Sequence, residues 1–188
     1  MRLEGKIAVV VGAGQGPGTG MGNGRATSIR FAQEGAKILA VDRDLASAEE
    51  TAAMAREKGG ECVAFAADVT KEATLAAAIA AARERWGRID VLHNNVGVSI
   101  AGGDAPPTEI TEEAFDRICA INLRGTVMAC KHVLPIMRAQ GAGAIVNISS
   151  AAAVENYPYV PTRRPSRRWS PSPNKSPSRT RNTACART

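Results

Sequence analysis

The sequence has few cysteines and no long apolar run. Its four cysteines, Cys62, Cys119, Cys130 and Cys185, show neither C-x-x-C nor metal-ligand spacing. This argues against a disulfide framework or a metal site and favours reduced thiols in a cytoplasmic protein. No apolar stretch approaches the roughly 18 residues that a membrane span needs, and the apolar part of the opening MRLEGKIAVVVGAG is too short for a signal peptide. We therefore expect a soluble protein with no membrane partner.

Acidic residues are absent from residues 161–188, which hold eight Lys or Arg. The net charge of +6 belongs to this tail, because residues 1–160 contain 16 basic and 18 acidic side chains. The tail is rich in Pro, Ser, Thr and Arg, a composition typical of disordered segments. Residues 1–160 instead have enough apolar content for one folded domain. We expect a domain over 1–160 and a disordered basic tail over 161–188.

Short β-branched runs alternate with longer alanine-rich segments in residues 1–160. The runs predict buried strands and the segments predict helices, and Gly35 and Gly59-Gly60 are helix stops. This alternation predicts an α/β protein with a doubly wound parallel sheet. The predicted strands are Ile7–Val11, Lys37–Val41, Cys62–Ala66, Val91–Leu92 and Ala144–Ile148, and the predicted helices are Arg25–Glu34, Leu45–Lys58, Leu75–Trp86 and Glu112–Ala139.

Glycine occupies every even position from Gly12 to Gly24, between the first predicted strand and the first helix. Without side chains, backbone N–H groups can approach a pyrophosphate, and a helix N-terminus favours negative charge. A flexible glycine linker is the alternative, but the position after a strand favours a phosphate site.

The second strand ends at Asp42, 18 residues after Gly24. A carboxylate there can accept both ribose hydroxyls and repel a 2′-phosphate, which favours NAD over NADP. Arg43 beside it could support some NADP binding, and a plain surface aspartate is the alternative interpretation.

Further motifs follow the glycine loop: AVDRD around Asp42, ADVT at 67–70, HNNVG at 93–97, INLRG around Asn122, and IVNISS at 145–150. Together with the loop, they make residues 3–160 resemble the short-chain dehydrogenases/reductases. The resemblance implies a Rossmann-like sheet of five strands in the order 3-2-1-4-5, with the family's C-terminal strands and substrate lid missing. It also implies an alcohol or carbonyl substrate and a homo-oligomer, whose interface through the helix from Glu112 is incomplete here.

The family spaces its loop glycines as G-x-x-x-G-x-G, which this chain can match in two ways. Gly12, Gly16 and Gly18 fit the spacing, but the family's helix register favours Gly22 and Gly24 as the last two positions. This second alignment inserts six residues after Gly12, and such an insertion either covers the phosphates more fully or holds them more loosely. Val11 replaces the usual threonine before the first glycine.

The resemblance assigns nine residues to the cofactor. The loop and the first helix supply the phosphate site, and Asp42 supplies the ribose contact. The residues after the third strand line the adenine pocket, and the NNAG-like element passes beside the cofactor. They are Gly12, Gly22, Asn23, Gly24, Asp42, Asp68, Val69, Asn94 and Gly97. His93, which precedes the asparagine pair, is interpreted as a strand residue.

Family members use a tyrosine and a lysine in a Y-x-x-x-K motif, with a serine and an asparagine, to transfer hydride and proton. Ser150 and Asn122 match the serine and the asparagine; a helix-capping serine and a helix-surface asparagine are the alternatives. The tyrosine position holds Thr162, and Tyr157 and Tyr159 come too soon. We therefore expect an oxidoreductase that is impaired as written.

Codon degeneracy permits a one-base-shifted translation near codon 160 that places tyrosine at the position of Thr162 and lysine at that of Ser166. We hypothesise such a frame slip, in the gene or in its sequence. The alternative is a non-catalytic nucleotide-binding protein whose basic tail contacts RNA phosphates, which composition alone supports weakly.

Overall fold

Five parallel strands form one sheet in the order β3-β2-β1-β4-β5. The computed structural model describes residues 1–16 and 18–150, so the predicted tail, the domain boundary at 160 and the Thr162 position lie outside the described residues. The strands are β1 Ile7–Val11, β2 Lys37–Asp42, β3 Cys62–Ala66, β4 Val91–Asn94 and β5 Ala144–Asn147. The predicted doubly wound α/β sheet and its strand order are confirmed.

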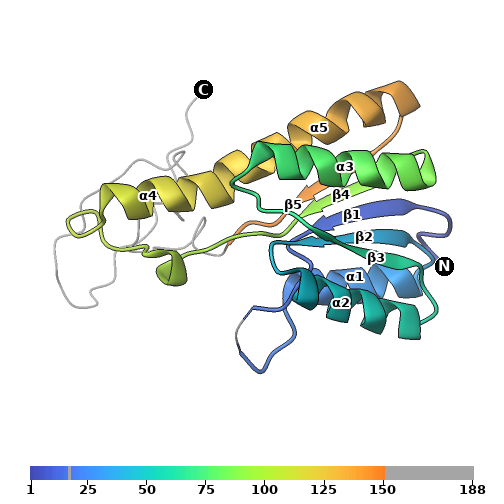
Figure 1. Cartoon of the computed structure of the whole chain (residues 1–188), viewed down its shortest axis with the longest axis horizontal. Coiled ribbons are helices and arrows are strands. Elements are labelled where there is room, and N and C mark those ends of the chain that lie inside the picture. The colour runs from blue at the N-terminus through green and yellow to red at the C-terminus, as the bar shows by residue number, and fades with distance from the viewer. Residues whose placement is uncertain (17, 151–188) are drawn as a thin grey trace, which may run out of the picture.

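The helices cover both faces of this sheet (Figure 1). Helices α1 Asn23–Gln33 and α2 Leu45–Glu57 pack on one face, and α3 Glu72–Trp86 and α5 Gly125–Gln140 pack on the other. A strand between two helical layers has no solvent-facing side, which is why β1 reads IAVVV and is buried at every position.

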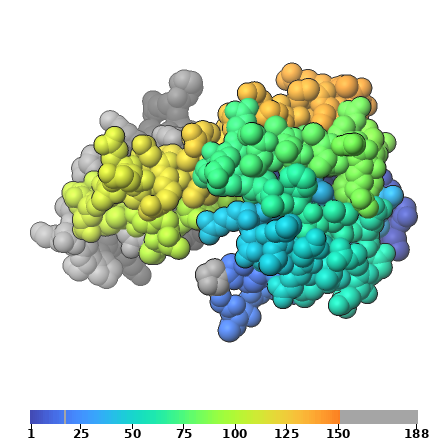
Figure 2. Space-filling model, viewed as in Figure 1, coloured from blue at the N-terminus to red at the C-terminus, as the bar shows by residue number. Residues whose placement is uncertain are grey.

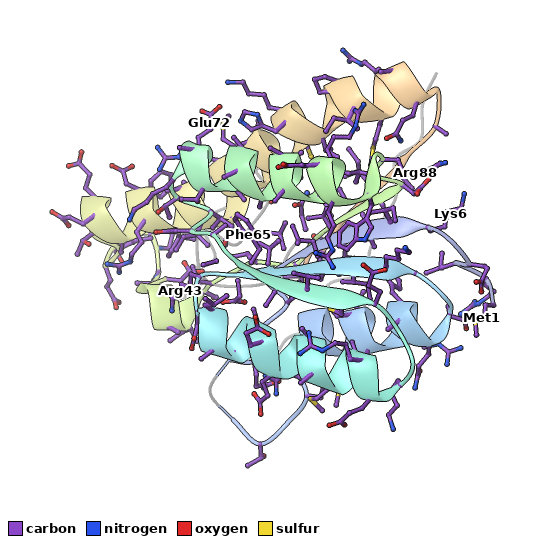
Figure 3. All side chains as sticks on the ribbon, turned by 45° about the vertical axis from the view of Figure 1, so that its right-hand side comes forward. Met1, Lys6, Arg43, Phe65, Glu72 and Arg88 are labelled. Carbon is purple, nitrogen blue, oxygen red and sulfur yellow. The ribbon has the colours of Figure 1, made fainter. Side chains whose placement is uncertain are left out.

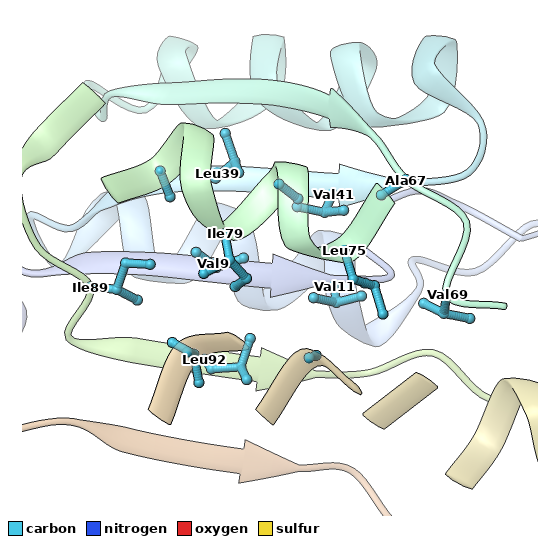
Figure 4. Close-up of a cluster of buried hydrophobic side chains, with 14 of the residues drawn as sticks. Val9, Val11, Leu39, Val41, Ala67, Val69, Leu75, Ile79, Ile89 and Leu92 are labelled. Carbon is cyan, nitrogen blue, oxygen red and sulfur yellow. The ribbon is translucent and has the colours of Figure 1, made fainter. Parts of the chain in front are cut away.

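The larger core cluster lies between the sheet and the α3–α5 layer (Figure 4). Val9, Val41 and Leu92 from the strands meet Leu75 and Ile79 from α3, all nearly inaccessible to water. Each fully buried side chain of this kind stabilises the fold by roughly 1.5–3 kcal/mol. The core therefore sets the sheet rigidly and holds its carboxyl edge in place.

Asp90 connects several groups at the opposite, amino-terminal edge of the sheet. Its carboxylate accepts the backbone N–H of Ile7 at 2.9 Å and the Nε–H of Arg88 at 3.0 Å, and lies 3.9 Å from Lys6 Nζ. Figure 3 shows Lys6 and Arg88 at this edge and Arg43 at the other. Burial raises the pKa of Asp90, but the bonds from Arg88 and Ile7 outweigh it and hold the pKa below its usual value.

The long helix predicted over Glu112–Ala139 is divided in the structure. Helix α4 covers Glu112–Cys119, a π-helical turn η2 covers Ala120–Arg124, and α5 follows directly. A short 3₁₀ turn, η1 at Ile100–Gly102, was not predicted. No helix among residues 1–16 and 18–150 is long and apolar enough to cross a membrane.

Candidate functional site

The predicted site residues lie at the carboxyl edge of the sheet because parallel strands all end there. Gly12 follows β1, Asp42 ends β2, Asn94 ends β4, and Ser150 lies exposed three residues beyond β5. This edge is where open α/β sheets bind ligands. The segments after the strands then decide which side chains meet.

Helix α1 approaches β1 more closely than any side chain would permit. A Cβ placed on Gly24 would lie 1.8 Å from the carbonyl oxygen of Gly12, and a Cβ on Gly12 would lie 2.7 Å from Val96 Cγ2. Gly12 also has φ +84°, which glycine adopts without strain. Gly24 is thus required by close contact with the backbone of Gly12, and Gly12 by its positive φ and by the neighbouring Val96, in both cases independently of any ligand.

The start of α1 favours the alignment that uses Gly22 and Gly24. Gly22 precedes the first helical residue, Asn23, whereas Gly16 lies in the preceding loop. No side chain caps this helix. The backbone N–H groups of Asn23, Gly24 and Arg25 have no acceptor among the described residues, so the first turn presents unpaired donors at the sheet edge.

Asp42 fastens the beginning of the glycine loop to the end of β2. Its Oδ2 accepts the N–H of Gly14 at 2.9 Å, and its Oδ1 accepts the N–H of Asp44 at 3.1 Å. A Cβ on Gly14 would lie 2.8 Å from the Asp42 carboxylate and from Ser47 Oγ. The carboxylate therefore stands beside the loop, with side-chain oxygens that can accept further donors.

The segment after β3 is held by local hydrogen bonds. The Oδ1 of Asp68 accepts the Thr70 hydroxyl at 2.7 Å and the Thr70 N–H at 2.9 Å, and these bonds lower the pKa of Asp68. Val69 is buried, and a Cβ on Gly125 of α5 would lie 2.8 Å from its Cβ. Asp68 and Val69 thus form an ordered turn between the sheet and α5.

Three asparagines connect the ends of β1, β4 and β5. The Nδ2 of Asn94 donates to Asn147 Oδ1 at 2.9 Å, and the Nδ2 of Asn95 donates to the carbonyl of Gly12 at 3.1 Å. Asn94 Oδ1 is buried without a partner in the described part of the chain. Asn95 was not among the predicted site residues, although the motif HNNVG contains it.

Asn122 lies in the π-helical turn and holds the chain that follows β4. Its Oδ1 accepts the N–H of Val98 and its Nδ2 donates to the carbonyl of Val98, both at 2.8 Å. A Cβ on Gly97 would lie 3.8 Å from the same Oδ1. The structure thus brings together Gly97 and Asn122, two residues predicted from separate motifs.

Sequence reasoning missed one residue of the glycine loop, Gln15, and one residue of α2 that binds the loop, Ser47. The backbone N–H of Gln15 donates to Ser47 Oγ at 2.7 Å, and the Oε1 of Gln15 accepts the N–H of Gly22 at 2.7 Å. A signal existed for Gln15, which is the side-chain amide between Gly14 and Gly16 in the glycine run. No sequence signal existed for Ser47, because it lies in α2 and only the folded structure brings its hydroxyl to the backbone of Gln15.

The other titratable candidates do not form a second site in the described residues. No group of three His, Cys, Asp or Glu there could hold a metal ion. Cys62, Cys119 and Cys130 are free, and burial raises the pKa of the Cys62 thiol to about 12. His93 is buried in β4 against the edge of Phe31, with ring centroids 6.2 Å apart, in keeping with a strand residue.

Known proteins match this chain both in sequence and in fold. The chain is 40% identical over 155 residues to levodione reductase of Leifsonia aquatica and 39% identical over 155 residues to 2-(R)-hydroxypropyl-CoM dehydrogenase of Xanthobacter autotrophicus. Each match covers 81% of this chain, which spans 55% and 59% of the two relatives.

A solved structure of NAD+-bound xylitol dehydrogenase superposes with a TM-score of 0.77 at 34% identity, over 86% of this chain and 59% of that one. The sequence model described as short chain dehydrogenase matches residues 6–162. The chain therefore belongs to the short-chain dehydrogenase family of oxidoreductases.

Proposed function

We propose that the chain binds NAD(H) at the carboxyl edge of its sheet and serves hydride transfer between this cofactor and an alcohol or carbonyl compound. The observation that carries the proposal is the position of Asp42, whose carboxylate adjoins the glycine loop through Gly14 at 2.9 Å. The substrate class rests on the relatives, which are named as a reductase and dehydrogenases. NADP is disfavoured because its 2′-phosphate would meet the Asp42 carboxylate.

The residues present fit a dinucleotide. Gly12 and Gly24 let the start of α1 lie directly against the end of β1, and three first-turn N–H groups of α1 are unpaired in the described chain. Backbone donors at a helix N-terminus are suited to a pyrophosphate. We assign this role to Gly12, Gly22, Asn23 and Gly24.

The remaining cofactor residues line the same edge. Asp42 accepts the adenosine ribose hydroxyls, Asp68 and Val69 border the adenine, and Asn94 and Gly97 border the nicotinamide half. When bound, NAD(H) supplies or accepts the hydride at its nicotinamide ring. The protein's own task is to orient both reactants and to exclude water from them.

Two residues are assigned to the reacting end. Ser150 orients the substrate oxygen through its hydroxyl. Asn122 acts through the backbone: by pairing with both polar groups of Val98, it holds the chain beyond β4 against the π-helical turn. The family's tyrosine and lysine would transfer and support the proton, but Thr162 and Ser166 occupy their positions. We therefore propose weak turnover for the chain as written.

Binding and turnover are tested separately. NADH fluorescence titration should give saturable binding, with a higher affinity for NADH than for NADPH. Asp42→Ala should lower the affinity for NADH and reduce the preference for NADH over NADPH by about tenfold, because a hydrogen bond to a charged group contributes about 1.5 kcal/mol. Asp116→Ala, an exposed carboxylate on α4, is the control. Equal affinity of wild type and Asp42→Ala for both cofactors would overturn the assignment.

Turnover is compared with a chain in which the reading frame after residue 160 is restored. An alcohol and carbonyl panel with NAD(H) should show activity in the restored chain and little in the chain as written. Comparable activity of the two would contradict the proposed impairment.

A further inference from the structure

The side chain of Gln15 in the glycine loop forms hydrogen bonds with backbone groups of residues 16, 20 and 22. The carboxamide of Gln15 accepts the N–H of Gly22 at 2.7 Å and donates from Nε2 to the carbonyl oxygens of Gly20 at 2.7 Å and Gly16 at 3.0 Å. We call these three hydrogen bonds the Gln15 bridge. It spans from the beginning of the loop to the residue that precedes α1.

The base of this bridge is attached to the rigid part of the molecule. The backbone N–H of Gln15 donates to Ser47 Oγ on α2, and the preceding Gly14 donates to Asp42. Ser47 Oγ also lies 3.4 Å from an Arg25 guanidinium nitrogen of α1. The backbone at Gly14 and Gln15 is therefore attached to β2 and to α2 before the Gln15 side chain reaches across the loop.

The glycines at 16, 18 and 20 have little packing support among the described residues. A Cβ placed on Gly16, Gly18 or Gly20 would meet nothing within 4 Å, so these glycines are not packed against other residues. The loop projects at the lower edge of the molecule in Figure 2. Glycines lose more conformational freedom on ordering than other residues, so the Gln15 bridge is what offsets this cost here.

The bridge ends beside the unpaired donors of α1. Its acceptor bond orients the peptide of Gly22, and the next three N–H groups, those of Asn23, Gly24 and Arg25, have no acceptor in the described chain. We infer that Gln15 is a positioning residue that orders the elongated glycine loop around the pyrophosphate of the dinucleotide. This inference rests on the proposed cofactor site and identifies a residue that the family's glycine spacing does not include.

The test uses the whole chain and a variant that keeps bulk but removes hydrogen bonds. Gln15→Met retains the length of the side chain and loses the Gln15 bridge, and Gln33→Met, an exposed position of α1, is the matched control. We expect the Kd for NADH to rise about fivefold in Gln15→Met and to stay unchanged in Gln33→Met. Because the loop lies outside the core, the melting temperature should change by less than about 2 °C.

A second measurement requires no cofactor. Backbone amide hydrogen exchange of the peptide that includes Gly22 should become faster in Gln15→Met and remain unchanged in Gln33→Met, while the strands keep their protection. Unchanged exchange, or normal NADH binding by Gln15→Met, would overturn the inference alone. A wild-type chain that fails to bind NADH would overturn the proposed function and the cofactor role of Gln15, while the exchange result would still decide whether the bridge orders the loop.

Discussion

Replacing Gly24 by alanine tests the closest contact in the site. The added Cβ would lie 1.8 Å from the Gly12 carbonyl oxygen, whereas Cβ atoms essentially never approach another atom within 3.0 Å. Both partners belong to backbone, so no rotamer change can relieve the clash. Helix α1 would have to move by at least 1.2 Å, which would separate its buried residues Ser28 and Ala32 from the sheet.

The expected loss follows from two opposing effects. Forcing an extra methyl group into a packed region costs about 1–3 kcal/mol, and alanine returns up to about 1 kcal/mol through its higher helix propensity. A net loss of about 2 kcal/mol would lower the melting temperature of a chain of this size by about 4–8 °C. Urea denaturation measures the free energy, and thermal unfolding provides an independent value.

The matched control is Gly16→Ala in the same loop. A Cβ on Gly16 would meet nothing within 4 Å, so this variant should change the unfolding free energy by less than about 0.5 kcal/mol. If Gly24→Ala were as stable as Gly16→Ala, the close approach of α1 to β1 would be wrong.

Two further predictions concern pH. Asp90→Asn should lower the unfolding free energy at neutral pH by about 2 kcal/mol, because it weakens the bonds from Arg88 and Ile7. The pKa of Asp90 is lowered in the fold, so its contribution to the free energy of unfolding is present above the unfolded pKa of about 3.9 and is lost as the pH falls below it. In urea denaturation from pH 7 to pH 3, the free energy of unfolding should therefore fall less steeply in the variant than in the wild type. Burial lowers the pKa of His93, so the unfolded state binds a proton more readily and wild-type stability should decline below about pH 6.5. His93→Leu should remove that part of the decline, and an identical pH profile in variant and wild type would show that His93 does not contribute.

The sheet could be predicted from the sequence because its signals are local. Strands Ile7–Val11 and Cys62–Ala66 have the bounds expected from their apolar runs. For β1, which is buried at every position, burial on both faces requires an uninterrupted apolar stretch. The strand order came from the family resemblance rather than from any single strand. The grouping of Gly12, Asp42 and Asn94 at one edge then follows from parallel strands ending together.

The contacts made by loops could not be predicted in the same way. Gln15 reaches Gly22, and Asn122 reaches Val98, only after the fold brings separate segments together. Such bonds depend on side-chain direction, for which sequence spacing in glycine-rich or irregular segments gives no period. The roles assigned to Ser150 and to the Thr162 position stay predictions.

The π-helical turn at Ala120–Arg124 has a consequence for the directions of the two helices it joins. A regular α-helix rotates each successive residue by about 100°, so removing one residue from this turn would rotate all of α4 by that amount relative to α5. Ile118 would then leave the core, and Asn122 could no longer face Val98 while Gly125 still touched Val69. The widened turn therefore lets α5 present an apolar side to the sheet while Asn122 presents its amide to the segment after β4.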